Sequence, residues 1–447
     1  MNYFIFGYAN SVSDLTAEKI AFEGLAILVE TPVLSGYVAT DFQNQVADPG
    51  DVVRAPYPVE MTANRIPEGS SATVNNLTTG SHLVTLNQHI SQAFSIGDRE
   101  QQRSFVEISE FFIAPAVRSM ANMANDIIQG EKYRSYKSTV GKIGTALAYT
   151  DILAAGKLQT KANVPAIGRN MFIGADAGAD IRNMDKFVDN VSSTDPSLVR
   201  MGAIGAINGY MVHETNSFSS VDASTRVTGA VNSAVMVKGT TSVTVDGFSA
   251  AITTGSWCTI DGVPYRITGT TGGATPTAIA IESPGLRDAV ADNAVVYVYT
   301  PSAVNGGTYA VGYEGAIGWD GAVTPKIGQG VTFGTDGDPY SIIAVSSTEI
   351  WLNRPVDVAI ADNASIFLMP AGNFGLGLYR NSIQLVNRPL ALPRANQGVD
   401  AYVASGMGWS IRVMSSYDIL AKKTTYAMDF IMGIATIDKN ANVIVLG

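Results

Sequence analysis

The feature that most constrains this sequence is a β-rich cassette that occurs twice between Met236 and Met369. The first copy contains Asp261-Gly262-Val263-Pro264-Tyr265 and, further on, Ala291-Asp292-Asn293-Ala294. The second contains Asp336-Gly337-Asp338-Pro339-Tyr340 and then Ala361-Asp362-Asn363-Ala364. The copies differ in length where the first has the turn-rich segment 269–276, a place where a β-unit tolerates insertions. Units this short need a host or each other to close a core, so we expect an inserted, duplicated all-β region.

The bulk composition limits the classes of function. At 447 residues the chain is long enough for about three domains. Only 15% of its residues are charged, against about 25% in ordinary soluble domains, which favours surfaces covered by other subunits. A net charge of −10 without clustered Lys and Arg argues against a nucleic-acid-binding surface. The single Cys258 excludes an internal disulfide and is expected to be a small buried hydrophobe.

No export or membrane segment is expected from the sequence. The N-terminus, Met1–Tyr8, is apolar, but it lacks a basic start and a small-residue cleavage site, so it makes a poor signal peptide. No uncharged apolar run approaches the roughly 18 residues that a membrane span needs. These patterns indicate a soluble, unexported protein.

The N-terminal part of the chain is predicted to form a helix followed by a hairpin. Residues Ser13–Glu30 read as an amphipathic helix, capped by Ser13 or Asp14, with Phe22, Leu25, Leu28 and Val29 on one face. Val53–Met61 alternates as a strand, and Pro56 and Pro58 place it at an edge. A second alternating run includes Val84, Leu86, Ile90, Phe94 and Ile96. With the polar stretch Asn64–Ser81 between them, the two runs predict a long projecting β-hairpin.

A long helix and a divided domain are predicted to follow. An apolar stripe predicts a helix from Asp98 to Gly130, which Pro115 should kink or divide. The stripe consists of Phe105, Ile108, Phe112, Ala116, Met120, Met123 and Ile127. Mixed α and β follows, with a helix over Thr145–Leu158 and a strand at Met171–Ile173. The cassettes occupy about 228–369 and interrupt one domain with halves 131–227 and 370–447. In the second half Leu376–Leu385 is helical or extended, and strands are predicted at Ser410–Met414, Tyr426–Ile437 and Val443–Leu446.

The residues that most often carry chemistry form no convincing set. The histidines are His82, His89 and His213; the first two would face opposite sides of a regular strand, so a shared metal is not expected. The loop Gly141–Thr145 lacks the Lys-Ser/Thr ending of a phosphate loop and is interpreted as a flexible helix entry.

Acidic and aromatic residues allow specific hypotheses of metal or ligand binding, but a structural role is favoured for each. Asp176, Asp180 and Asp185 match no calcium loop, and a capped helix start is favoured. Asp336-Gly337-Asp338 resembles part of a calcium loop, but Asp261-Gly262-Val263 lacks the second carboxylate, so turns explain both copies better. Trp257, Trp319 and Trp351 could stack on nucleic acid or sugars; no basic groove accompanies them, and core packing is the default for Trp257 and Trp351.

The order of these elements resembles the Hong Kong 97-type fold of tailed-phage major capsid proteins, in particular short-tailed phage coat proteins with an inserted β-barrel domain. The matching segments are Leu15–Ala21, Leu25–Leu28, Pro49–Pro56, Phe111–Val117, Ala121–Asn122, Gly205–Val212, Ser410–Val413, Tyr417–Ile419 and Tyr426–Asp429. Each is weak alone, and their order makes the resemblance specific.

The resemblance implies an α+β fold and a domain plan. The plan is an N-terminal arm (1–48), an extended β-hairpin loop (49–97), a spine helix with the peripheral domain (98–140), the first half of an axial domain (141–227), cassette 1 (228–301), cassette 2 (302–369) and a second axial and peripheral half with the C-terminal strands (370–447). It also implies a structural role with no catalytic residue, cofactor or metal. The expected partners are further copies of the chain in pentamers and hexamers, a scaffolding protein, a portal and a decoration protein. DNA would be enclosed in a virion assembled in the host cytoplasm, without sequence-specific binding.

Two departures from the family pattern matter. The family usually carries one inserted barrel, whereas here the insertion is duplicated. Some related capsids form an isopeptide bond from a hairpin lysine, but no lysine lies between Lys19 and Lys132, so that covalent link is not expected. The alternatives are a cargo-carrying shell protein of the same fold and, further off, a β-rich adhesin or tail protein.

Overall fold

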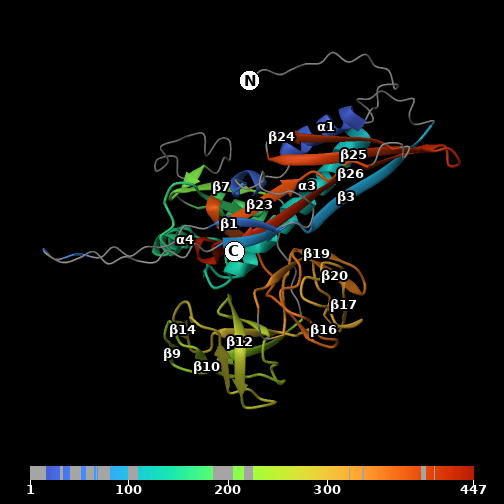
Figure 1. Cartoon of the computed structure of the whole chain (residues 1–447). Coiled ribbons are helices and arrows are strands. Elements are labelled where there is room, and N and C mark those ends of the chain that lie inside the picture. Colours follow the sequence, from blue (N-terminus) through green and yellow to red (C-terminus); the bar gives the residue numbers. More distant parts are fainter. Residues whose placement is uncertain are drawn as a thin grey trace. The chain divides into compact units, whose positions relative to one another are not determined.

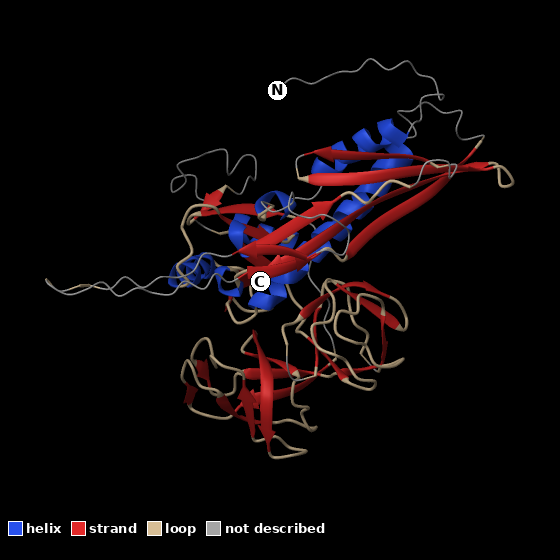
Figure 2. Cartoon of the chain, in the orientation of Figure 1, coloured by secondary structure: helices blue, strands red, loops and turns tan. Residues whose placement is uncertain are grey.

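The computed structural model describes most of the chain, and its described part is α+β with many strands and few helices (Figure 2). The described residues are 17–30, 34–40, 52–56, 65–66, 68, 81–98, 109–184, 205–215, 225–321, 323–334, 337–393, 399–406 and 408–447. Within these ranges, no helix is both long and apolar enough to cross a membrane. The chain divides into two compact units. Unit 1 contains Met1–Pro32, Val38–Ala121 and Ile383–Ile437, and unit 2 contains Val33–Tyr37, Asn122–Ser382 and Asp438–Gly447.

Unit 1 is built on an antiparallel sheet around one long strand, β26 (Lys423–Thr436). One edge of β26 pairs with β25 (Trp409–Asp418), which pairs in turn with β24 (Asp400–Gly406). Its other edge pairs with β3 (Gln88–Gly97). β23 (Ile383–Arg388) pairs with the last residues of β26 on the edge opposite β3, because Ile431 and Met432 pair with both strands. The single strand β26 therefore holds together segments from both ends of the sequence.

Helix α1 (Ala17–Glu30) packs against β24 and β25 of this sheet (Figure 1). Its buried face consists of Ala17, Ile20, Ala21, Gly24, Leu25 and Leu28. Leu25 and Leu28 are buried as predicted, but Phe22 is 52% exposed, so its assignment to the apolar face is wrong. Phe22 lies one residue past Ala21, outside the stripe that spacings of three and four generate, and its ring lies 5.6 Å from that of Tyr402. The predicted caps Ser13 and Asp14, and the side chain of Val29, lie outside the described residues.

The predicted hairpin is present only in part. Strand β1 (Val52–Pro56) pairs with β2 (Ser81–Thr85) in an antiparallel two-stranded ribbon, and Pro56 lies at its last pair. Val84 is buried in unit 1, whereas Arg54 and its partner Leu83 are exposed. The alternating run that includes Ile90, Phe94 and Ile96 is β3, which belongs to the large sheet and not to the hairpin. Alternation marks a strand but does not identify its neighbour. Apart from 65–66 and 68, residues 57–80 lie outside the described part.

The predicted long helix is described from Ser109 onward. Five residues, Ser109–Ile113, form a π-helical turn (η4), and α3 (Ala114–Gly130) continues from it. Pro115 stands where the π turn passes into the α-helix, as expected for a residue that cannot donate a backbone hydrogen bond. Ala116, Met120 and Ile127 of the predicted stripe are buried, but Met123 is 37% exposed, and Ala124 is buried in its place. Phe105 and Ile108 lie outside the described residues.

Unit 2 contains a second sheet in the order β4-β27-β22-β5-β7-β6. Its strands are β4 (Thr139–Val140), β27 (Val443–Leu446), β22 (Phe374–Tyr379), β5 (Arg169–Ile173), β7 (Tyr210–Glu214) and β6 (Ala206–Ile207). The helices of this part are α4 (Tyr149–Lys161) and α5 (Ala175–Arg182), together with the 3-10 turns η2 (Leu34–Tyr37), η5 (Glu131–Ser135), η7 (Arg380–Ser382) and η8 (Lys439–Ala441). The predicted helix over Thr145–Leu158 therefore begins and ends a few residues later.

The segment 370–447 is divided between the two compact units. Leu376–Leu385 is extended, and its two strands, β22 and β23, belong to different sheets. Residues 383–437 cluster with unit 1, and only 370–382 and 438–447 return to the sheet of unit 2. The predicted strands at Ser410–Met414, Tyr426–Ile437 and Val443–Leu446 are present.

The cassettes form two closed six-stranded barrels, whose described residues contain strands and loops without helix (Figure 2). Barrel 1 consists of β8 (Arg226–Val231), β10 (Ser242–Asp246), β11 (Trp257–Ile260), β12 (Val263–Thr271), β13 (Ala278–Ile281) and β15 (Val295–Tyr299), with the short pair β9 (Val235–Met236) and β14 (Val290–Ala291) beside it. Barrel 2 consists of β16 (Ser302–Val304), β17 (Ile317–Asp320), β18 (Gly330–Phe333), β19 (Tyr340–Val345), β20 (Glu349–Leu352) and β21 (Ser365–Leu368). When the six strands of each barrel are numbered in chain order, both barrels have the same order around the barrel, 1-2-5-4-3-6.

Irregularities of the two barrels also coincide, which supports a duplication. A β-bulge follows Ile267 in β12 and Ile342 in β19. Asn293 and Asn363 both adopt the left-handed conformation, with φ of 61° and 59°. Their backbone N–H groups donate to Val231 and Val304, the last residues of β8 and of β16. The repeated Ala-Asp-Asn-Ala sequence is therefore one turn, used at the same place in each barrel.

Candidate interaction sites around the two barrels

The three histidines lie on separate strands and do not form a site. His82 is on β2, and His89 on β3 lies 3.2 Å from the carboxylate of Asp429. The ring of His213 on β7 packs against Tyr37 and Phe172, and its burial lowers its pKa. No group of three or more His, Cys, Asp or Glu in the described residues could hold a metal ion. Among the predicted candidates that the structure describes, none are brought together as metal ligands.

The acidic candidates have structural partners. Asp176 lies in the first turn of α5, where a carboxylate favours the positive end of the helix dipole. Asp180 accepts a hydrogen bond from the backbone N–H of Leu147 at 3.0 Å. In the second cassette, Asp338 is paired with Arg134 and Lys439, so its carboxylate serves an ion network. Asp185 and Asp336 lie outside the described residues.

The Asp-Gly pair of the first cassette forms a turn, as predicted. Asp261 and Gly262 join β11 to β12 with φ of 51° and 78°, the signs of a type I′ hairpin turn. The loop Gly141–Thr145 contacts this turn: the N–H of Ile143 donates to the carbonyl of Gly262 at 2.9 Å, and Lys142 pairs with Asp261. A Cβ at Gly262 would lie 3.0 Å from Cβ of Lys142, so the approach is close. The loop interpreted as a helix entry is thus also a docking point for barrel 1.

Trp257 packs in a core as expected, but the same expectation for Trp351 is wrong: it alternates on β20 with the buried Ile350 and Leu352 and lies outside the core of barrel 2. Trp257 is fully buried, and its indole N–H donates to Oγ1 of Thr332 at 3.1 Å, which links the barrels. Trp319 is buried in the core of barrel 2, and Trp351 is half-buried on β20. Cys258 is a buried thiol in the core of barrel 1, and its burial raises its pKa, as expected for a small hydrophobe.

One short stretch of chain contacts both barrels. We call Gly130–Ile143, which follows α3, the junction segment. Toward barrel 2, the Tyr133 hydroxyl donates to the carbonyl of Gly328 at 2.6 Å. Arg134 pairs with Glu131 at 2.9 Å and lies 3.6 Å from Asp338 and 3.8 Å from Asp357. The buried Glu131 carboxylate also accepts from the Asn353 amide at 3.1 Å. The polar contact with barrel 2 is therefore made mainly by charged and amide groups.

Toward barrel 1 the junction segment uses other residues. The Tyr136 hydroxyl donates to the carboxylate of Glu282, which also pairs with Lys137 at 2.7 Å. The guanidinium of Arg287 donates to the backbone carbonyl of Tyr136 at 2.6 Å. Burial and the neighbouring Glu282 raise the pKa of Tyr136, so its hydroxyl stays a donor at neutral pH.

An aromatic cluster fills the space between the barrels, the junction segment and the sheet of unit 2. Its buried members are Tyr133, Tyr136, Trp257, Tyr299, Phe367, Met369, Phe374, Ile444 and Leu446. The rings of Tyr136 and Trp257 meet edge to face at 5.1 Å. Because the members come from both barrels and from the sheet, removing one exposes apolar surface of several parts at once.

The junction segment also carries a buried lysine. Lys132 is 5% exposed, and its ammonium donates to the carbonyl of Phe374 at 3.3 Å. Burial lowers the pKa of Lys132 to about 7, against the attraction of Asp126. Burial likewise raises the pKa of Asp126 to about 6, partly offset by a hydrogen bond from Gln129 and by the charge of Lys132. Sequence patterns gave no sign of this pair.

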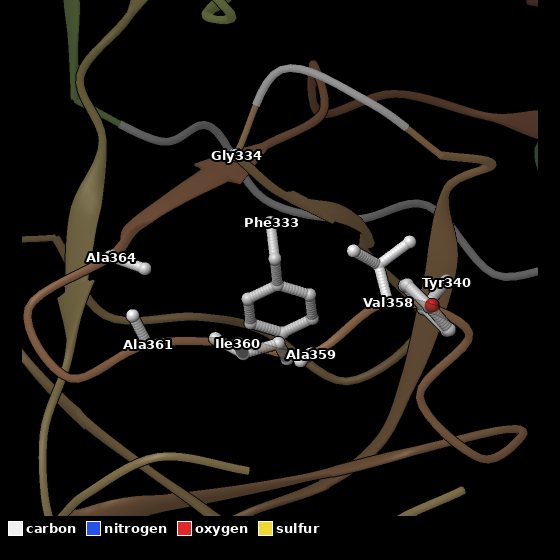
Figure 3. A pocket seen from close by; sticks show the side chains of 8 residues that line it. All are labelled: Phe333, Gly334, Tyr340, Val358, Ala359, Ile360, Ala361 and Ala364. Carbon is white, nitrogen blue, oxygen red and sulfur yellow. The ribbon is translucent and has the colours of Figure 1, made fainter. Parts of the chain in front are cut away.

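Barrel 2 has a small apolar pocket, shown in Figure 3. Its volume is about 290 Å³, and the side chains of Phe333, Tyr340, Val358, Ile360 and Ala361 line it (Figure 3). The Tyr340 hydroxyl already accepts from the N–H of Asp357 at 2.7 Å. No charged side chain lines the pocket, so it suits an apolar group and offers no acid, base or nucleophile.

Sequence reasoning missed the role of the repeated Pro-Tyr pair. In barrel 1, Arg287 donates to the carbonyl of Pro264 at 2.8 Å, and its guanidinium lies 4.9 Å from the Tyr265 ring. In barrel 2, Arg354 donates to the carbonyl of Pro339 at 2.9 Å and lies 3.9 Å from the Tyr340 ring. The tyrosine hydroxyls accept the backbone N–H groups of Arg287 and Asp357, which correspond in the repeat. The two arginines do not correspond, and for this reason comparing the copies residue by residue does not reveal them.

Comparisons with known proteins place the chain near phage capsid structures. No family model and no curated protein matches it. A solved structure of Mycobacterium phage Che8 is similar with a TM-score of 0.44 and 11% identity, over 93% of this chain and 90% of that one. The cyanophage P-SCSP1u capsid is similar with a TM-score of 0.41 and 9% identity, over 100% and 90%. The mature capsid of bacteriophage PhiM1 gives 0.39 and 8%, over 92% and 85%. At such scores the likeness does not establish a shared function, so the function is argued below from the chain's own residues.

Proposed function

We propose that this chain is a major capsid protein of the Hong Kong 97 type, which assembles as pentamers and hexamers into an icosahedral head around double-stranded DNA. The order of its elements supports the proposal: an N-terminal helix, a two-stranded ribbon, a long helix entered through Pro115, and two sheets completed by the C-terminal strands. The resembling segments fall on these same elements, among them Phe111–Val117 on η4 and α3 and Tyr426–Asp429 on β26. Its role is structural, and we assign no residue to catalysis.

The observation that carries the proposal is the apolar surface that unit 1 leaves exposed. Its large apolar side chains with at least 48% exposure, among the described residues of unit 1, are Phe22, Leu83, Phe111, Leu392, Tyr417, Ile419 and Leu420. Leu420, in the turn between β25 and β26, is 95% exposed. A monomer gains nothing by presenting such residues to water, whereas a permanent subunit contact covers them. The low share of charged residues, 15%, agrees with surfaces of this kind.

The ribbon β1–β2 has the second property expected of an assembling subunit. Its strands pair with each other and with no further strand of the described chain, so its outer edges remain open. A two-stranded ribbon is marginally stable by itself, and open edges pair readily with another chain. We assign it to contact with a neighbouring copy, as the described part of the extended loop expected at 49–97, from which β3 is excluded because it lies in the large sheet.

The remaining assignments follow from this plan. Residues 228–301 and 302–369 are an insertion in the axial domain, and 98–140 is the spine. A scaffolding protein, a portal and a decoration protein are the proposed partners besides further copies. Because the net charge is −10, we expect the shell to confine DNA without sequence-specific contacts.

Electron microscopy of the purified chain, alone and co-expressed with a scaffold, tests the proposal. We expect closed shells or tubes, and persistent monomers under all conditions would contradict the proposal.

Deleting residues 63–80 is expected to abolish assembly while circular dichroism shows a folded monomer. Normal shells from this variant would refute the role of the ribbon. Deleting Gly273 and Ala274 from the exposed β12–β13 loop of barrel 1 is the matched control and should leave assembly intact. Because the ribbon contains no lysine, it cannot form an isopeptide bond to a neighbouring chain. Shells boiled in detergent should therefore release single chains.

A further inference from the structure

A cleft in unit 2 gathers positive charge in an otherwise acidic chain. It lies between α4, β4 and loops of barrel 1 and has a volume of about 480 Å³. Five cationic side chains line it, against the two carboxylates of Asp151 and Asp288. The cations are Lys137, Lys157, Lys161, Lys238 and Arg287. We call this group the basic cleft. No part of the proposed shell role requires it.

The cations come from separate elements that converge on one cavity. Lys157 and Lys161 lie on one face of α4, with Asp151 and Ala154 of the same helix also lining the cleft. Lys238 belongs to the loop after β9, and Arg287 to the loop before β14. Lys137 comes from the junction segment. A shared cavity of one sign concentrates the electrostatic potential more than scattered surface charges do.

The cleft has cationic capacity that its own carboxylates do not use. Lys137 pairs with Glu282 at 2.7 Å, and Lys238 lies 3.8 Å from Asp288. Lys157 and Lys161 have no ion pair within the described residues, and Asp151 accepts the N–H of Ala148. Arg287 is held in place by the carbonyls of Pro264 and Tyr136, and its Nε is buried without a hydrogen-bond partner in the described part. A fixed guanidinium beside the ammonium groups of Lys157 and Lys161 is suited to an oxyanion.

We propose that the basic cleft binds a phosphate-bearing anion with several negative charges. The volume and the number of cations favour a chain of two or three phosphate groups over a single carboxylate. The same chemistry has two possible sources, a free polyphosphate and the backbone phosphates of enclosed DNA. A competing explanation is that Lys157 and Lys161 only stabilise the C-terminal end of α4 through its dipole.

Calorimetric titration of the full-length chain with inorganic tripolyphosphate at about 50 mM salt tests the site. We expect saturable binding that weakens as salt rises. The double variant K157E/K161E should lose affinity by about tenfold or more, because charge-assisted hydrogen bonds to phosphate are among the stronger ones. The variant K326E/K422E makes the same change of charge at exposed lysines that do not line the cleft, and it should bind like the wild type.

A second titration with a short duplex DNA separates the sources. If tripolyphosphate alone binds, the ligand is a free polyphosphate; if the duplex also binds and K157E/K161E abolishes this, the backbone phosphates occupy the site. Absence of tripolyphosphate binding, or equal affinity in K157E/K161E, would overturn the proposal. The explanation based on helix stability predicts a lower free energy of unfolding for K157E/K161E and no binding by the wild type, so both are measured on the same preparations.

Discussion

The two barrels share a frame and differ in how they join the rest of unit 2. Both have the same strand order, a bulge at the same place and a left-handed asparagine in the same turn. Barrel 1 joins the junction segment through Tyr136, Lys137 and the loop around Lys142. Barrel 2 joins it through the Glu131–Arg134 network. The attachments to the rest of unit 2 therefore differ between the copies, although Asp261 of the shared Asp-Gly turn contributes to that of barrel 1.

The contact between the barrels extends this comparison. Trp257 on β11 bonds to Thr332 on β18, and Arg266 of barrel 1 donates to the carbonyls of Gly334 and Gly337 in barrel 2. In the strand register, the position that Trp257 fills in barrel 1 is Gly330 in barrel 2. At Gly330 a Cβ would meet Sδ of Met369, so barrel 2 leaves this position empty. Because barrel 1 has Trp257 where barrel 2 has Gly330, the two copies can pack against each other asymmetrically.

The largest expected effect comes from removing this tryptophan. Trp257→Ala deletes a fully buried side chain in the aromatic cluster and should lower the free energy of unfolding by about 3–5 kcal/mol. Urea denaturation followed by circular dichroism measures the loss. Trp351→Ala, which removes a half-buried indole from barrel 2 alone, is the control and should cost less. An equal or smaller loss for Trp257→Ala would mean that the cluster does not unite the barrels energetically.

A smaller effect is expected at the sheet of unit 2, where Lys132 should make the stability depend on pH. Lys132 contacts the carbonyl of Phe374 on β22, and its pKa in the folded chain is lowered to about 7. Between about pH 7 and 8.5 the unfolded chain holds a proton that the folded chain releases, so the free energy of unfolding should rise with pH. One such proton contributes up to about 1.4 kcal/mol per pH unit. Above this window the thiol of Cys258, whose pKa is raised in the folded state, acts in the opposite direction.

The comparison of Lys132→Met with the wild type measures this contribution. The variant should lose the rise between pH 7 and 8.5, whereas Lys326→Met at an exposed position should retain it. A rise that persists in Lys132→Met would assign the pH dependence to another group.

The duplication, most strands and the long helix can be predicted from the sequence because they depend on local pattern. Asp261-Gly262 forms the turn that its residue types favour, and Val443–Leu446 is a strand as its apolar run indicates. Partners could not be predicted, because alternation in β3 does not say that it pairs with β26 and not with β1. The arginine contacts of Pro264 and Pro339 were missed for a related reason. Their donors come from positions that do not align, and only the folded chain brings them together.

The candidate residues divide in the same way. The turn at Asp261 and the buried Cys258 followed from residue type, whereas the basic cleft could not be found from the sequence. Its cations are spread from Lys137 to Arg287 with no run of basic residues, so a search for clustered charge along the chain overlooks them. Charge that is scattered in sequence gathers where α4, the junction segment and loops of barrel 1 line the same cleft.

The smallest effect is the most direct test that the barrels are structural copies. Asn293 and Asn363 have φ near 60°, where asparagine is tolerated and alanine costs about 1 kcal/mol. Asn293→Ala and Asn363→Ala should therefore each lower the free energy of unfolding by about 1 kcal/mol, and by similar amounts. Glycine at either position should be nearly neutral because it adopts this conformation freely. If alanine costs stability in one barrel alone, or if glycine costs as much as alanine, the shared turn does not stabilise both barrels through its backbone conformation. In that case the asparagine side chains, which donate to Asp292 at 2.9 Å and to Asp362 at 3.0 Å, would carry the difference between the copies.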